Sequence, residues 1–139
     1  MTQPGRAAEL RTLIELPALR RLADRGLSDE ELAASRRLAR ATVRSARSGD
    51  PRGYLEADAV FHLYLLGLVS EAALTGVARL LFDSRSAHRP AGSESAQRMA
   101  IEAGEHGEIV DLLADDMISA ASEMLRRHLA AGILEPGEP

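Results

Sequence analysis

Hydrophobic positions recur at helical spacing along most of the chain. In residues 6–23 the apolar positions that fall near one helical face are Leu10, Leu13, Ile14, Leu19 and Leu22. Pro17 lies inside this segment and predicts a kink or an interruption, because proline removes one helical hydrogen bond. Gly26 follows as a stop signal, so the first helix is expected to end before it.

The second helix has a clear start. Ser28 is followed three residues later by Glu31, the pattern of a capping box, and Gly49 ends the segment. The helix carries five arginines, which are Arg36, Arg37, Arg40, Arg44 and Arg47. Acidic residues flank this run and no aromatic side chains accompany it, so we interpret it as a solvated helix face. A stripe that contacts nucleic acid is the alternative.

Further helices follow from caps and breakers. Asp50-Pro51 is an N-cap followed by a proline at the first helical position. Asp115 or Asp116 is the expected cap of the last helix, which ends near residue 131. The Ser, Gly and Pro-rich residues 84–95 indicate a loop whose ends can be helical. The helices expected after the second one cover about residues 51–69, 71–83, 96–113 and 116–131.

These elements predict an all-α fold, an antiparallel bundle of six or seven helices. Residues 1–7 are expected to be a flexible N-terminal segment, 8–131 a single helical domain and 132–139 a flexible tail. Aromatic residues are only 3% of the chain, so the core is expected to consist mainly of Leu, Ala, Ile and Val. Such a core favours packed helices over a sheet.

Charge and cysteine content exclude several classes of function. The formal net charge is −4, which gives no general attraction for a phosphate backbone and argues against direct nucleic-acid contact by this chain. The absence of cysteine excludes disulfides, thiolate zinc sites and cysteine nucleophiles. No apolar run approaches a membrane span and no signal-peptide core is found, so a cytoplasmic location is expected.

Histidines provide the candidate chemistry. Asp58 and His62 are four residues apart on one helix, so their side chains point the same way, within an apolar run. His106 and His128 lie on later helices and can approach the same face if those helices are antiparallel. Three imidazoles and one carboxylate suit a divalent transition metal such as Zn, Ni, Mn or Fe. His88 falls in the expected loop and is interpreted as a solvated residue.

Spacing alone leaves other interpretations open. The histidines can simply be packed in a structural bundle, and Asp58 with His62 can be a surface ion pair. A metal-dependent enzyme is a second alternative, since a metal with open positions can activate water or dioxygen. Neither a nucleophile motif nor a poised general base supports that alternative, so we expect no enzymatic activity.

Four segments together resemble a known domain. They are Glu9-Leu10-Arg11 with Glu15, Gly49-Asp50 with Tyr54 and Asp58-Ala59-Val60-Phe61-His62, Glu105-His106 with Ile109, and Met124 through His128-Leu129. This pattern is similar to the ligand-sensing C-terminal domain of GntR-superfamily transcription regulators, the FCD type named after the fatty-acid regulator FadR. The resemblance covers about residues 8–131.

The resemblance implies a metal, an effector and a partner. It implies that Asp58, His62, His106 and His128 hold a divalent metal, and that a small organic acid binds beside it. Arg11 matches a family arginine that can form a fork with an effector carboxylate, and a surface salt bridge to Glu15 is the alternative. The presence of all four ligands disfavours the metal-free branch that binds an acyl-CoA. The family usually dimerises, so a homodimer is expected.

The family's DNA-reading part does not appear in this sequence. Family members carry an N-terminal winged helix-turn-helix, whereas only residues 1–6 precede the first expected helix here. We therefore expect either a truncated regulator or a natural orphan sensor, in which any DNA contact is made by the missing N-terminal domain. The sequence itself names neither the metal, the effector nor the operator.

Overall fold

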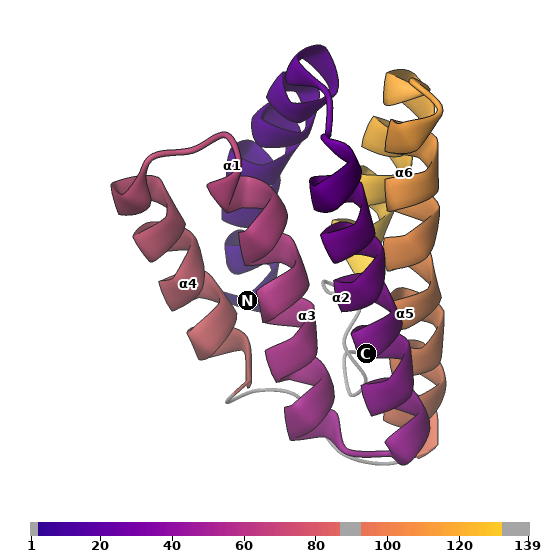
Figure 1. Cartoon of the computed structure of the whole chain (residues 1–139). Coiled ribbons are helices and arrows are strands. Elements are labelled where there is room, and N and C mark those ends of the chain that lie inside the picture. Colours follow the sequence, from indigo (N-terminus) through magenta and orange to yellow (C-terminus); the bar gives the residue numbers. More distant parts are fainter. Residues whose placement is uncertain (1–2, 87–92, 132–139) are drawn as a thin grey trace.

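Six helices form an antiparallel bundle in the computed structural model (Figure 1). The structure describes residues 3–86 and 93–131, and this part of the chain contains no strand. The helices are α1 (Gln3–Arg25), α2 (Asp29–Ser48), α3 (Pro51–Gly67), α4 (Ala72–Ser86), α5 (Ser93–Ala114) and α6 (Ile118–Ala131). The predicted all-α bundle is confirmed.

Local signals set the ends of α2 as predicted. The Ser28 hydroxyl accepts a hydrogen bond from the Glu31 backbone at 3.1 Å, and the Glu31 carboxylate accepts one from the Ser28 backbone at 3.0 Å. Both halves of the capping box are therefore present. Gly26 and Gly49 have φ of 84° and 78°, the left-handed conformation in which glycine ends α1 and α2 without strain.

Pro17 does not interrupt α1. The helix continues through it over 23 residues, so the interruption that the sequence offered as one of two outcomes, beside a kink, does not occur. Pro17 would have bonded to the carbonyl of Leu13, four residues earlier, and both residues lie on the exposed side of α1. Water can therefore hydrate the carbonyl that proline leaves free, which makes the missing hydrogen bond tolerable.

The structure tests two other boundaries. The predicted loop over residues 84–95 has helical ends, as the sequence allowed, because α4 reaches Ser86 and α5 begins at Ser93, while His88 lies outside the described residues. Neither Asp115 nor Asp116 caps α6, so that prediction was wrong. Asp116 has a left-handed φ of 63°, and the turn continues to Met117, whose carbonyl accepts the first helical hydrogen bond of α6.

The bundle buries a core of mainly leucine and alanine. Helix α2 packs between α3 and α5, α6 packs between α5 and α1, and α4 lies outside against α1 and α3 (Figure 1). The main buried cluster includes Leu19, Leu22, Phe61, Val110 and Leu125. Among the described residues, none of the helices has the length and apolarity needed to span a bilayer.

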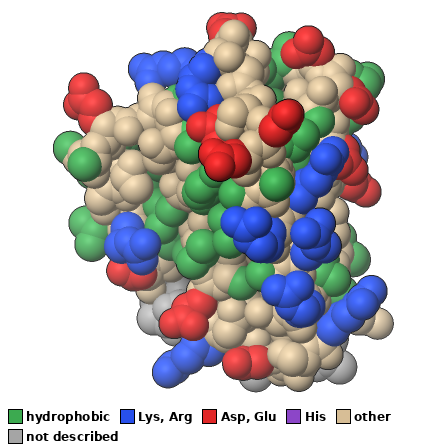
Figure 2. Space-filling view, in the orientation of Figure 1, with side chains coloured by type: hydrophobic (Ala, Val, Ile, Leu, Met, Phe, Trp, Pro, Cys, Tyr) green, Lys and Arg blue, Asp and Glu red, His purple; other side chains and the backbone are tan. Residues whose placement is uncertain are grey.

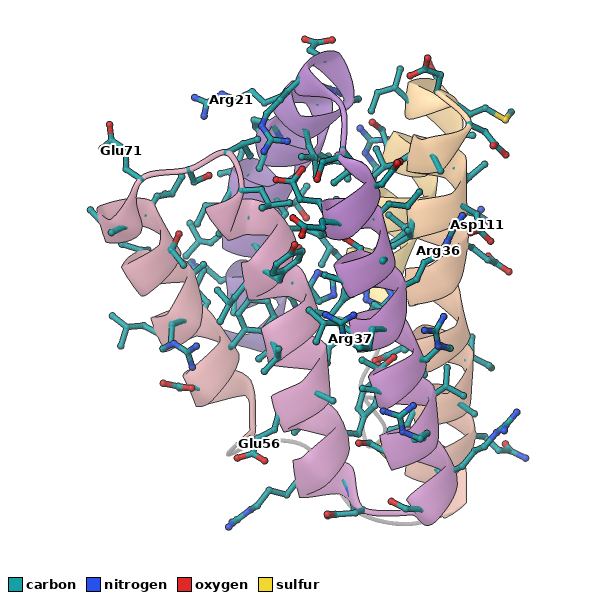
Figure 3. The ribbon with its side chains drawn as sticks, viewed as in Figure 1. Arg21, Arg36, Arg37, Glu56, Glu71 and Asp111 are labelled. Atoms are coloured by element: carbon teal, nitrogen blue, oxygen red, sulfur yellow. The ribbon has the colours of Figure 1, made fainter. Side chains whose placement is uncertain are left out.

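The arginines of α2 lie mostly on the outside of the bundle. Basic side chains gather on the face over α2, and no histidine is visible on this face (Figure 2). Arg36 donates a hydrogen bond to Asp111 of α5 at 3.1 Å, and the two side chains lie next to one another in Figure 3. Arg37, Arg40 and Arg44 are exposed. This arrangement agrees with a solvated helix face.

Candidate metal centre

Three helices bring one carboxylate and three imidazoles together in the middle of the bundle. Asp58 and His62 lie one turn apart on the inner face of α3, His106 comes from α5 and His128 from α6. All four residues are buried, and one ligand atom from each lies within 4.8 Å of the others. The structure therefore assembles the residues that the sequence predicted as a cluster.

Distances centre the cluster on the carboxylate of Asp58. Its Oδ1 lies 2.7 Å from His106 Nε2, 3.3 Å from His62 Nε2 and 3.9 Å from His128 Nε2. The Nε2 atoms of His62 and His128 are 3.1 Å apart. Each histidine thus presents the same nitrogen, Nε2, to one common point.

The buried carboxylate of Glu15 contacts the second ring nitrogen of His62. The Nδ1 of His62 lies 2.8 Å from Glu15 Oε1, while Glu15 Oε2 accepts a hydrogen bond from Arg11 Nε at 2.9 Å. Burial alone would raise the pKa of Glu15, but the charges of Arg11 and His62 outweigh it and lower that pKa to about 2. Glu15 is therefore ionised and can only accept the hydrogen bond from His62.

The other two histidines also have a partner at Nδ1. His128 Nδ1 lies 2.7 Å from Glu105 Oε1, and His106 Nδ1 lies 2.9 Å from the hydroxyl of Thr42. That hydroxyl donates its own proton to the Ala39 carbonyl at 2.6 Å. Thr42 Oγ1 is therefore left as the acceptor for a proton on His106 Nδ1.

These partners fix the protonation of the imidazoles. With a proton on each Nδ1, a neutral histidine has only a lone pair on Nε2. His106, His62 and His128 then direct three lone pairs at one point beside Asp58. Three buried lone pairs directed at one point beside a carboxylate are unfavourable unless a cation lies between them. The three imidazoles and the carboxylate therefore fit a divalent transition metal.

Burial and charge pull the pKa values of two imidazoles in opposite directions. Burial would lower the pKa of His62, but the nearby carboxylates of Glu15 and Asp58 raise it above its ordinary value. For His106, burial dominates over the effect of Asp58 and lowers the pKa to about 3. At neutral pH His106 is neutral, the form that can bind a metal.

Arg11 lies next to this cluster but is not part of it. Its pairing with Glu15 is present, although it is buried and not on the surface as the alternative interpretation supposed. The guanidinium carbon lies 4.1 Å from the centre of the Phe82 ring, so the cation rests on an aromatic face. Its Nη2 is buried and has no hydrogen-bond partner among the described residues, which leaves a cationic donor available to an anion.

Space around the site is small in this conformation. A cavity of about 20 Å³ borders Glu15, Phe61 and His62, enough for one water molecule. A much larger surface cavity of about 1110 Å³ lies between α3 and α4 and is bordered by Phe82. The Phe82 ring centre is 5.7 Å from that of His62, so this side chain lies between the larger cavity and the histidines.

Sequence analysis did not identify the three partners behind the histidines. Glu15 was identified as a part of the family pattern and as a partner of Arg11, and Glu105 as a part of the family pattern, but neither was identified as a partner of a histidine. Thr42 was not considered, although it leaves a detectable signal. It is a polar residue at core spacing in α2, three residues from Ala39 and four from Ala46, and all three are buried.

An all-helical bundle around a buried set of three histidines and a carboxylate defines a class of ligand-binding helical domains. The family model of the FCD domain matches residues 6–131, and the chain therefore belongs to the FCD domain family. This is the C-terminal effector-binding domain of GntR-family transcription regulators. No curated protein and no solved structure gives a significant match to the chain.

Proposed function

We propose that this domain binds a divalent transition metal through Asp58, His62, His106 and His128, and a small organic acid beside it. The metal is one of Zn, Ni, Mn or Fe, the ions that imidazole-rich sites accept. The observation that carries this proposal is the convergence of three Nε2 atoms on Asp58 Oδ1 within one buried cluster. FCD domains often bind metals, which supports the same assignment.

The metal would supply a Lewis-acidic positive charge to the ligand pocket. Asp58 and His62 provide the fixed side of the site, because both sit on the same face of α3. His106 and His128 bring α5 and α6 to it. Metal binding therefore holds three helices of the domain together, and its free energy adds to the stability of the fold.

Arg11 is the group that we assign to the effector. Its buried Nη2 has no hydrogen-bond partner in the part of the chain that the structure describes, and a carboxylate can accept a short charge-assisted bond from it. Glu15 connects Arg11 to His62 through its two oxygens, so an acid bound at Arg11 lies close to the metal ligands. An anion with a carboxylate group is therefore the favoured class of effector.

An organic-acid effector needs more room than the small cavity beside His62 offers. The cavity beside His62 has room for about one water molecule, so an organic acid must displace side chains to enter. Phe82 is the side chain between the site and the larger cavity along α4. Displacement of Phe82 would give the acid access to Arg11, which lies against the same ring.

In the regulator, effector binding would change the shape of the domain and so the spacing of DNA-binding domains. This coupling requires that the effector binds two conformations with different affinity. We infer a homodimer in the cytoplasm, with DNA contacted by an N-terminal domain outside this sequence and not by this chain. The net charge of −4 agrees with the inference that this chain itself does not contact DNA.

Metal content is the direct test of the proposal. Protein purified without chelator is analysed for transition metals, and then again after stripping and reloading with Zn²⁺ or Ni²⁺. We expect about one ion per chain. Negligible metal after reloading would contradict the proposal. Turnover of small carboxylic acids by the loaded protein would support the enzymatic alternative, whereas binding without turnover supports the sensor.

A further inference from the structure

Three side chains contact the histidines at the nitrogen that points away from the cluster. Glu15, Thr42 and Glu105 each meet the Nδ1 atom of one imidazole at 2.7–2.9 Å. They come from α1, α2 and α5, so they are not neighbours in sequence. None of their oxygens is among the candidate ligand atoms of the cluster.

We propose that these three are positioning residues, which set the metal affinity by fixing the far nitrogen of each imidazole. The inference rests on the proposed metal site and goes beyond its four ligands. A hydrogen bond at Nδ1 keeps the proton there, orients the ring and leaves Nε2 as the free donor. A carboxylate at Nδ1 also makes the imidazole a stronger donor to a cation.

The three partners are not equivalent. Glu15 and Glu105 are carboxylates, whereas Thr42 is a neutral hydroxyl whose own proton is already used at Ala39. His62 and His128 are therefore expected to be the stronger donors. Glu15 is further shared with Arg11, so its removal would leave a buried guanidinium charge close to the metal. Loss of the Glu15 charge should consequently weaken metal binding more than loss of the Glu105 charge.

Zinc affinity measured by competition with a chelating dye tests the proposal. Glu15→Gln and Glu105→Gln retain an acceptor oxygen but remove the charge. We expect Glu105→Gln to lower affinity by about tenfold and Glu15→Gln to lower it further. Glu105→Leu removes both the acceptor and the charge, and the expected loss is closer to a hundredfold. The change to glutamine should thus recover part of the affinity lost in the leucine variant.

Thr42 offers a matched pair of variants. Thr42→Val has nearly the same shape but no hydroxyl, so it leaves the proton on His106 Nδ1 without an acceptor. Thr42→Ser keeps the hydroxyl and is expected to bind zinc like the wild type. Glu108→Gln is the control for net charge, because Glu108 is exposed on α5, one turn beyond Glu105.

A nitrogen NMR measurement separates positioning from a merely structural role. In metal-free protein at alkaline pH, we expect all three histidines to carry the proton on Nδ1. Thr42→Val should shift His106 toward the other tautomer and leave His62 and His128 unchanged. A change in fold stability alone would not move one histidine selectively.

Two results would overturn the inference. One is zinc affinity within twofold of wild type in both Glu105 variants and in Thr42→Val. The other is a proton on Nε2 of these histidines in the metal-free wild type. If the wild type binds no zinc or nickel, the proposed metal function fails, and the tautomers then decide whether the three partners orient the imidazoles.

Discussion

His62 and His128 face each other with their Nε2 atoms 3.1 Å apart, while the Nδ1 atom of each ring is held by a glutamate. The two rings are nearly parallel, with an interplanar angle of 22° and centroids 5.1 Å apart. Two neutral imidazoles in this arrangement repel one another through their lone pairs. A proton or a metal ion between them would remove this conflict, which agrees with the proposed metal site.

Metal removal should therefore destabilise the domain. Zinc at about a hundred times its dissociation constant adds about 2.7 kcal/mol to the free energy of unfolding, which raises the melting temperature by about 10 °C in a chain of this size. Thermal melts followed by circular dichroism, with zinc and with EDTA, measure the shift. His62→Ala should abolish it, because the variant lacks one of the four ligands.

The thermal melts can be interpreted only if the His62→Ala variant still folds. Circular dichroism at low temperature shows whether His62→Ala keeps its helices, and Glu108→Gln is expected to keep the full zinc-dependent shift. Equal melting temperatures of the wild type with zinc and with EDTA would favour a purely structural cluster of histidines.

Arg11 should affect the effector more than the metal. Arg11→Met removes the cationic fork, and a panel of mono-, di- and tricarboxylic acids should bind at least about tenfold more weakly, since a hydrogen bond to a charged group contributes about 1.5–3 kcal/mol. Calorimetric titration of zinc-loaded protein measures this. Arg11→Lys keeps the charge without the planar fork and should give an intermediate loss.

The Arg11 variants need a second measurement, because Glu15 depends on Arg11 for charge compensation. Urea unfolding gives the stability of each variant. If a folded Arg11→Met binds the acids as tightly as the wild type, the assignment of Arg11 to the effector is wrong.

Acid should destabilise the metal-free domain through His106. Burial lowers the pKa of His106 to about 3 in the native state, against an ordinary value of 6.5. As the pH falls from about 6.5 toward 3, the unfolded chain takes up a proton that the native chain does not, so the free energy of unfolding decreases. Urea unfolding in the presence of chelator, at neutral pH and at pH about 4, checks the direction.

Glu15 and His62 modify this pH dependence with opposite signs. Glu15, with its pKa lowered to about 2 from 4.5, contributes stability that is lost as the pH falls from about 4.5 toward 2. His62, whose pKa is raised, contributes stability at low pH that is lost as the pH rises through its native value. His106→Gln should therefore show less loss between pH 6.5 and 4.5 than the wild type, and an equal loss would contradict the role of His106.

The capping box of α2 makes a separate contribution to stability. Ser28→Ala removes the oxygen that accepts a hydrogen bond from the Glu31 backbone, and should lower the free energy of unfolding by about 1 kcal/mol. Ser28→Thr keeps a capping oxygen and should retain most of the stability. Urea unfolding of both variants measures the difference, and an unchanged Ser28→Ala would show that the cap adds nothing.

Much of this fold can be predicted from local signals along the chain. Ser28 with Glu31 at the start of α2 and Gly49 at its end depend only on near neighbours, and the structure has both as predicted. The start of α6 depends on the path of the turn, and two adjacent acids, Asp115 and Asp116, made the local signal ambiguous. Periodicity also failed for Leu13, which is 71% exposed although its spacing suggested a buried face.

In the candidate site, too, some residues can be predicted from the sequence and others cannot. The pair of Asp58 and His62 follows from helical spacing, and the family pattern adds His106 and His128. The pairing of Glu15, Thr42 and Glu105 with the Nδ1 atoms depends on how α1, α2 and α5 pack across the bundle, which no local pattern specifies. Only Thr42, a hydroxyl in an apolar seam, could have been found from the sequence alone.

The hydrogen-bonded centre has an effect on how the bundle can move. Its polar residues come from α1, α2, α3, α5 and α6, and none comes from the part of α4 whose side chains the structure describes. Because these five helices all contribute to the hydrogen-bonded centre, we expect them to open together. Hydrogen exchange of their amides should therefore slow in all five helices when metal is added. Among the described residues of α4, Phe82 has its ring centre 5.7 Å from that of His62, and the helix packs against α1 and α3. We therefore expect α4 to open separately from the other five helices.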